Sequence, residues 1–176
     1  ILWWASLSGP MALPGNYKVE LKVNKNVKTQ NFSILKNPMS ESSLEDLTAQ
    51  FNFINDINNK MTETHKALKN VKKVRSQISQ LKKSITDKEK YKELLDYADD
   101  VMKRMTTIEE TLYQTKSKSG QDPLNFPIRL NNKLAHINSL TRVGNYKPTD
   151  QEIAFKNEVT AAIDKELAKL NYIFNT

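Results

Sequence analysis

Apolar and charged residues alternate strictly near the start of the chain. Tyr17, Val19, Leu21 and Val23 are separated by single charged residues, and a period of two is typical of a half-buried strand. A polar segment at 24–26 supplies turn residues, after which a second apolar pattern runs to Lys36. These features predict two strands joined by a turn.

The whole of 1–37 is predicted to be β structure. Its first residues, Ile1–Trp4, form an apolar run that is too short for a signal peptide or a membrane span and that is typical of an internal strand. Two or three strands cannot bury a core by themselves. We therefore expect them to be completed by upstream sequence, by a symmetry mate or by a separate protein chain.

The period of the apolar residues changes to about 3.5 after a short linker at 38–42. Apolar residues then recur at heptad spacing through 43–85, and no glycine or proline interrupts this stretch. A single helix of this length would be roughly 64 Å long. Its start carries a capping box that can form in either of two registers, Ser42 with Glu45 or Ser43 with Asp46.

Three further helices are predicted downstream. Thr86 with Glu89 forms a second capping box, and the connection before it is so short that this helix should fold back antiparallel on its predecessor. Pro127 is expected at the first position of a shorter helix. Thr149 with Glu152 should cap the last helix.

Together these patterns predict a mainly α fold. We expect an elongated antiparallel up-down bundle of about four helices at 43–176, preceded by two or three strands of an incomplete β-sandwich. The region from Leu44 to Thr176 should be almost entirely helical, with its two longest helices antiparallel. The seam residues expected to be buried are Phe51, Ile54, Leu94, Val101, Met105, Ile108 and Ile163.

The net charge of +7 is concentrated in one part of the chain. Residues 60–92 hold eleven lysines and arginines against three acids. They form either a face that binds a polyanion or, as we favour, a solvated face that pairs with acids of the next helix. No aromatic residue lies between Met61 and Lys90, so we expect no nucleic-acid binding. The candidate anion-binding residues are Lys69, Lys72, Lys73, Arg75, Lys82 and Lys83.

No residue pattern in the chain points to catalysis, to a cofactor or to a metal ion. The absence of cysteine excludes disulfides and thiolate metal sites. His65 lies on the apolar stripe, and His136 has no acid at helical spacing to complete a metal pair. The acidic pairs at 99–100 and 109–110 are adjacent in sequence, so their side chains diverge by about 100° and cannot converge on one bond. No segment approaches the ~20 apolar residues of a membrane-spanning helix.

Two blocks of the sequence carry a resemblance to a known group of proteins. The run Ile1-Leu2-Trp3-Trp4-Ala5-Ser6-Leu7-Ser8-Gly9-Pro10, with Leu13-Pro14-Gly15-Asn16-Tyr17-Lys18-Val19-Glu20-Leu21, resembles an element of bacterial secreted glycosyl-hydrolase-type proteins built on sortilin-like, Asp-box β-propellers. In those proteins this element closes an immunoglobulin-like β-sandwich. The later segments 75–78, 114–127, 132–134 and 147–152 also resemble their helical C-terminal region, so the resemblance covers essentially the whole chain.

The resemblance implies a secreted or cell-surface bacterial parent that processes glycans, in which 1–37 forms the terminal strands of the sandwich. It implies no activity for this chain, because no Asp-box motif or propeller carboxylate occurs in it. Our favoured hypothesis is a non-catalytic region that spaces or docks the other domains of the parent, with those upstream domains or another protein chain as partners. One alternative is a module that binds an anionic glycan through the basic face of 60–92. Another is an accessory region that completes the active site of a parent glycosidase.

Overall fold

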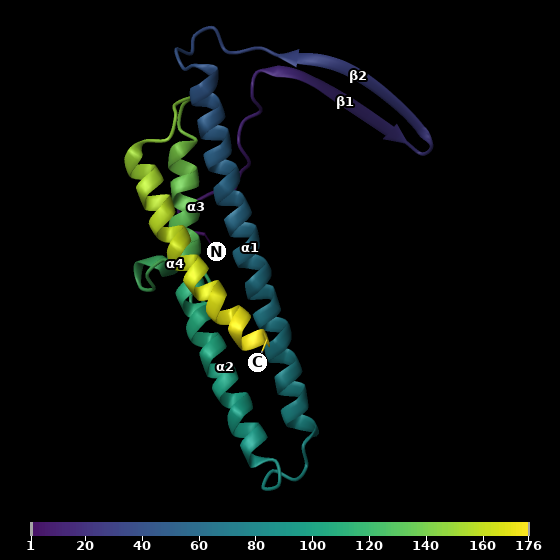
Figure 1. Cartoon of the computed structure of the whole chain (residues 1–176), viewed down its shortest axis with the longest axis vertical. Coiled ribbons are helices and arrows are strands. Elements are labelled where there is room, and N and C mark those ends of the chain that lie inside the picture. The colour runs from purple at the N-terminus through teal and green to yellow at the C-terminus, as the bar shows by residue number, and fades with distance from the viewer. Residues whose placement is uncertain (1, 176) are drawn as a thin grey trace.

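The computed structural model describes residues 2–175 of a mainly α chain (Figure 1). Ile1 and Thr176, the outer limits of the expected β segment and bundle, lie outside the described residues. Between Leu44 and Asn175 the described residues contain helices and connections but no strand, as predicted. The elements are β1 (Gly15–Val23), β2 (Asn26–Ile34), α1 (Leu44–Ser84), α2 (Lys92–Leu112), the 3₁₀ turn η1 (Asp122–Leu124), α3 (Leu130–Thr141) and α4 (Asp150–Asn175).

The four helices form three columns. The 41 residues of α1 make one column that is about 62 Å long. α2 and α3 follow one another along it and run in the same direction, antiparallel to α1 (Figure 1). α4 is the third column, and it contacts α1, α2 and α3. Because α4 packs on both α2 and α3, it keeps these two helices in line.

The ion pairs between helices fix these directions. Arg75 pairs with Glu109 and Lys82 with Asp99, so α1 and α2 are antiparallel, as predicted. Asp56 pairs with Lys156 and Lys60 with Asp164, so α1 and α4 are parallel.

The strict up-down alternation, and the expectation that the two longest helices are antiparallel, are therefore wrong. The second-longest helix is α4, with 26 residues, and it runs parallel to α1. α2 and α3 together supply about 50 Å of helix, which is what covering most of the long α1 requires. The 17-residue connection between them continues the column instead of reversing it.

Two of the three capping boxes are present. Ser43 accepts a hydrogen bond from the amide of Asp46 while the Asp46 carboxylate accepts one from the amide of Ser43, so the second register is the one used. Thr149 and Glu152 exchange the same pair of bonds at the start of α4.

Two other predicted helix starts are wrong. Thr86 caps nothing, because the chain needs residues 85–91 to turn back and α2 begins only at Lys92, without a side-chain cap. Pro127 lies three residues before α3, where its carbonyl accepts a hydrogen bond from the side-chain amide of Gln114.

The core follows the facing sides of the three columns. Of the predicted seam residues, the five that the structure buries are Ile54, Val101, Met105, Ile108 and Ile163. Phe51 is only half-buried and Phe53 is buried in its place. At this end α1 contacts both α3 and α4, so its buried face is wider than a heptad seam.

Leu94 is 44% exposed, contrary to the prediction. The last turns of α4 lie near Arg104–Ile108 of α2, with Ile173 beside them. Leu94 lies further toward the start of α2, where only α1 faces it. A two-helix seam leaves one side of each helix in water.

The expected β structure is present only in part. β1 and β2 pair antiparallel over their full length, with Tyr17 opposite Phe32 and Val23 opposite Asn26. Residues 2–14 form no strand, so the prediction for Ile1–Trp4 is wrong for its described residues. The main-chain amides of Trp3 and Ser6 are bonded by side chains of α3, which takes the place of a strand ladder. A two-stranded sheet gives no confirmation of a sandwich.

Candidate functional site

The predicted basic residues divide into two groups. Arg75 and Lys82 point to α2: the Arg75 guanidinium donates to Glu109 Oε2 at 2.7 Å and to Thr106 Oγ1 at 3.0 Å, and Lys82 pairs with Asp99. These two side chains bridge α1 and α2, as the solvated-face hypothesis expects. Because their charges are already compensated, they add little to any anion-binding surface.

The other four candidates, Lys69, Lys72, Lys73 and Lys83, are exposed on α1. Within residues 2–175 no acidic group lies within 4 Å of their ammonium nitrogens. Lys69 and Lys72 share a shallow hollow of about 230 Å³, whose other lining residues are His65, Leu68, Glu109 and Tyr113. Lys83 is eleven residues beyond Lys72, roughly 16 Å along the helix, and does not reach this hollow.

The surroundings of His65 disfavour its protonated form. Burial of the imidazole, with the positive charge of Lys69 as a second cause, lowers its pKa below the ordinary value. The positive charge of the hollow therefore comes from Lys69 and Lys72. His136 lies elsewhere, on α3, where its Nδ1 bonds the carbonyl oxygen of Trp4 at 3.1 Å.

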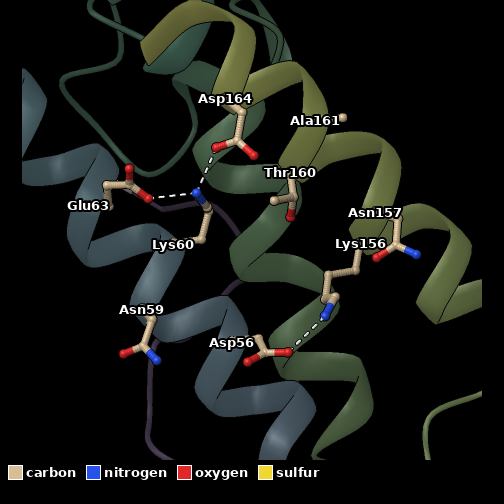
Figure 2. Close-up of a pocket in the computed structure, with 9 residues that line it drawn as sticks. All are labelled: Asp56, Asn59, Lys60, Glu63, Lys156, Asn157, Thr160, Ala161 and Asp164. Atoms are coloured by element: carbon tan, nitrogen blue, oxygen red, sulfur yellow. Dashed lines mark hydrogen bonds and ion pairs between the residues drawn. The ribbon is translucent and has the colours of Figure 1, made fainter. Parts of the chain in front are cut away.

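A second, larger hollow of about 510 Å³ lies between α1 and α4 (Figure 2). Lys60 reaches from α1 to Asp164 Oδ1 at 2.7 Å, and it also donates to Glu63 at 2.6 Å. Lys156 reaches back from α4 to Asp56 Oδ2 at 3.1 Å. Each helix thus contributes one lysine that pairs with an aspartate of the other helix.

These contacts keep the Lys60 amine protonated. Burial opposes its charge, but the hydrogen bonds from Lys60 to Asp164 and Glu63 outweigh burial and raise its pKa above the ordinary value. A nucleophilic lysine needs the opposite shift. The chemistry of this hollow is therefore that of a structural ion-pair network.

Three of the four carboxylates of the predicted acidic pairs have separate partners. Asp99 bonds Lys82, Asp100 lies 3.7 Å from Arg104, and Glu109 is held by Arg75. The described residues contain no group of three His, Cys, Asp or Glu that could hold a metal ion. Nor does any helix in residues 2–175 have the length and apolar character to cross a membrane.

A row of exposed apolar side chains lies on the hairpin. The register places Tyr17, Val19, Leu21 and Val23 on one side of the sheet together with Phe32 and Ile34 of β2, and we name these six residues the hairpin apolar face. Its exposed fractions reach 53% at Val19, 62% at Leu21 and 47% at Phe32. Neither strand packs on a helix, and the hairpin projects away from the bundle (Figure 1).

Within this face one contact stands out, the stacking of the Tyr17 and Phe32 rings with centroids 5.8 Å apart. The alternation of Tyr17–Val23 predicts the face from sequence. That the described residues leave most of it uncovered follows only from the structure. The α1–α4 hollow could not be predicted, because the register of α4 on α1 leaves no local signal in the sequence.

Comparisons with protein families, with curated proteins and with solved structures found no match to this chain. The resemblance to Asp-box propeller proteins therefore stays a prediction.

Proposed function

We propose that this chain is a non-catalytic interaction region of a larger secreted or cell-surface protein, in which the β1–β2 hairpin docks on another domain and the bundle serves as a rigid spacer. The observation that carries this proposal is the exposure of the hairpin apolar face. An isolated two-stranded hairpin is marginally stable in water. A contiguous apolar face with nothing packed on it is typical of an interaction site.

The chemistry of the hairpin indicates the kind of partner. β1 and β2 contain three lysines and one glutamate, and the turn between them adds Lys25. This positive charge disfavours pairing with a second copy of the same hairpin. A β-sheet surface with apolar residues inside an acidic rim fits both the apolar face and the lysines, and the unpaired edges of β1 and β2 can add to such a sheet.

The bundle is suited to spacing because its three columns are tied along their length. Lys60 and Lys156 tie α1 to α4, and Arg75 and Lys82 tie α1 to α2. The lysine pairs are partly exposed and contribute little stability each. They fix the register of helices whose apolar seams would otherwise allow sliding.

A matched pair of lysine substitutions tests the docking proposal. Leu21→Lys places a charge on the hairpin apolar face, whereas Thr29→Lys places the same charge on the opposite side of the sheet, across from Glu20. Binding to the remainder of the natural polypeptide, supplied as a separate protein, is measured by calorimetry. Leu21→Lys should weaken binding at least tenfold and Thr29→Lys less than twofold. Equal effects of the two substitutions, or no binding by the unaltered chain, would contradict the proposal.

The unpaired lysines of α1 support a second candidate, the binding of an anionic glycan. Lys69 and Lys72 converge on one hollow while Arg75 and Lys82 are engaged with α2. Replacing Lys69 and Lys72 by Gln should weaken binding to heparin, used as a model polyanion, about tenfold at 50 mM salt, and the wild-type affinity should collapse by 200 mM salt. Lys82→Gln is the control, with little effect expected. Salt-independent binding, or the same loss with Lys82→Gln, would exclude this candidate.

A further inference from the structure

The N-terminal segment lies along α3 as a strap without regular secondary structure, which we define as residues 2–8, and its backbone turns at Trp4, whose φ of 51° lies in the left-handed region. Its main chain is bound by side chains of the helix. Asn132 forms two hydrogen bonds with the main chain of Trp3. Its Oδ1 accepts from the Trp3 amide at 2.6 Å, and its Nδ2 donates to the Trp3 carbonyl at 3.0 Å. His136 Nδ1 bonds the Trp4 carbonyl at 3.1 Å.

The same pattern continues at Ser6. Its amide donates to Ser139 Oγ at 2.7 Å, and its carbonyl accepts from Asn138 Nδ2 at 2.8 Å. At Trp3 and at Ser6, α3 therefore supplies both the acceptor for the main-chain amide and the donor to the main-chain carbonyl. We name the four α3 side chains, Asn132, His136, Asn138 and Ser139, the α3 polar row.

The contacts of the two segments follow one another in the same order. Trp3, Trp4 and Ser6 meet Asn132, His136 and Ser139 in turn, so the strap runs parallel to α3 on both sides of the turn at Trp4. From Asn132 to Ser139 a helix advances about 10.5 Å, at 1.5 Å per residue. Residues 132, 136 and 139 also share one face of the helix. A chain that runs parallel to α3 with the same turn at the position of Trp4 meets this row at the same points.

The α3 polar row is partly buried. Its two asparagines are poor helix formers. Asn132 is 4% exposed and Asn138 is fully buried. Asn138 Nδ2 and Asn58 Nδ2 also approach the Ser8 carbonyl, each at 3.4 Å, and the Oδ1 atoms of both residues are buried without a hydrogen-bond partner among the described residues. The side-chain amide groups of Asn138 and Asn58 donate to the main chain of the strap, and their two Oδ1 atoms are further acceptors that no described residue engages.

Side chains of the strap add selectivity at two points. Leu2 and Ala5 pack against the core of the bundle, whereas Trp4 is 78% exposed. The site therefore accepts an apolar residue at the position of Leu2 and a small residue three positions later. The side chain at the position of Trp4 makes no selective contact, but the positive φ there favours glycine or asparagine.

We propose that the α3 polar row is a binding site for the main chain of a peptide, and that the strap is its occupant in the same chain. The site takes peptides by their main-chain amides and carbonyls, with an apolar residue followed three positions later by a small one. This inference is independent of the docking role of the hairpin, since it uses none of the hairpin residues. The α3 polar row is then a second interaction surface of the bundle, and another peptide reaches this surface by replacing the strap.

Cutting the tether of the strap in the intact protein tests this inference. A specific protease site is inserted between Pro10 and Met11, where the neighbouring Gly9 and Met11 are exposed. The full chain is cleaved after folding and mixed with a fluorescent peptide that spans residues 2–10. Fluorescence anisotropy then reports exchange of the peptide into the site. We expect saturable exchange with the helical circular dichroism unchanged by cleavage.

Three comparisons separate main-chain recognition from adventitious binding. A peptide N-methylated at Trp3 and Ser6 lacks the two donors and should bind at least tenfold more weakly, whereas a Trp4→Ala peptide should bind within twofold of the original. Asn132→Ala in the protein should also weaken binding tenfold, with the exposed neighbour substitution Lys133→Ala as its control. If cleavage melts the helices, if no peptide exchanges, or if the N-methylated peptide binds equally well, the strap is only a part of the fold and the inference is overturned.

Discussion

Glu109 is a carboxylate in the core, with 6% of its surface exposed, and its environment explains why Arg75 is not available to a ligand. The guanidinium of Arg75 donates to Glu109 and to the hydroxyl of Thr106. A buried charge that loses its partner is strongly destabilising, so such a pair is retained as a unit. Among the basic residues of 60–92, Arg75 is thus a structural residue, while Lys69 and Lys72 keep their charges toward water.

Truncating two residues of α2 measures how far the core extends. Ile108 is 4% exposed, so Ile108→Ala should lower the free energy of unfolding by about 2–5 kcal/mol. Leu94→Ala, at the end of the helix that α4 does not reach, should cost less than about 1 kcal/mol because Leu94 is already 44% exposed. Urea denaturation followed at 222 nm measures both. Equal losses would mean that a third helix covers Leu94.

At the scale of the elements, the ends of the helices were harder to predict than the helices themselves. The heptad pattern correctly locates α1, α2, α3 and α4, because each has to bury one apolar stripe. A capping motif is a pair of residues three apart, and Thr86 with Glu89 fits it as well as Ser43 with Asp46 does. What decides between them is the length of chain needed for the turn at 85–91, which no local pattern records.

Replacing the first residue of each motif by alanine tests this distinction. Ser43→Ala removes the hydroxyl that accepts from the Asp46 amide and should cost about 1 kcal/mol. Thr86→Ala removes no cap and should change stability by less than about 0.3 kcal/mol. Thermal unfolding of the two variants compares them directly. A larger loss for Thr86→Ala would show that α2 begins earlier than Lys92.

The Asp46 carboxylate gives the start of α1 a dependence on pH. Hydrogen bonds from the side chain and then the main chain of Ser43 lower its pKa below the ordinary value. A group whose pKa is lowered by folding contributes stability above its unfolded pKa and loses that contribution as pH falls through the folded pKa. Asp46→Asn should therefore be less stable than wild type at pH 6, and the difference should shrink below about pH 4. A difference that is constant from pH 3 to pH 6 would contradict this assignment.

At the scale of the whole molecule, the three-column arrangement depends on α2 and α3 running in line. Helical rise alone places Lys92, at the start of α2, about 45 Å from Leu140, near the end of α3. If α3 folded back on α2, the two residues would be less than about 30 Å apart. Both side chains are exposed and the chain has no native cysteine, so cysteines introduced at 92 and 140 can carry spin labels. Pulsed electron resonance should give a single distance in the longer range.

The whole-molecule features that the sequence did not reveal all depend on contacts between distant segments. Ile163 was correctly expected to be buried, but no pattern in α4 shows that this helix lies parallel to α1. The apolar run Ile1–Trp4 predicts a strand. The peptide groups of the strap are instead satisfied by Asn132 and Ser139, which lie far along the chain. A cluster of asparagine, histidine and serine on one helical face, at 132–139, was the available signal.

The central claim is that the hairpin is a docking element which another domain covers. Hydrogen exchange of the β1 and β2 amides, measured by mass spectrometry in this chain alone and in the larger protein that we propose carries it, tests the claim most directly. We expect fast exchange in the isolated chain, because the hairpin has water on both faces, and exchange at least a hundredfold slower in the larger protein, with α1 unchanged. Hairpin amides that exchange at the same rate in both would contradict the claim.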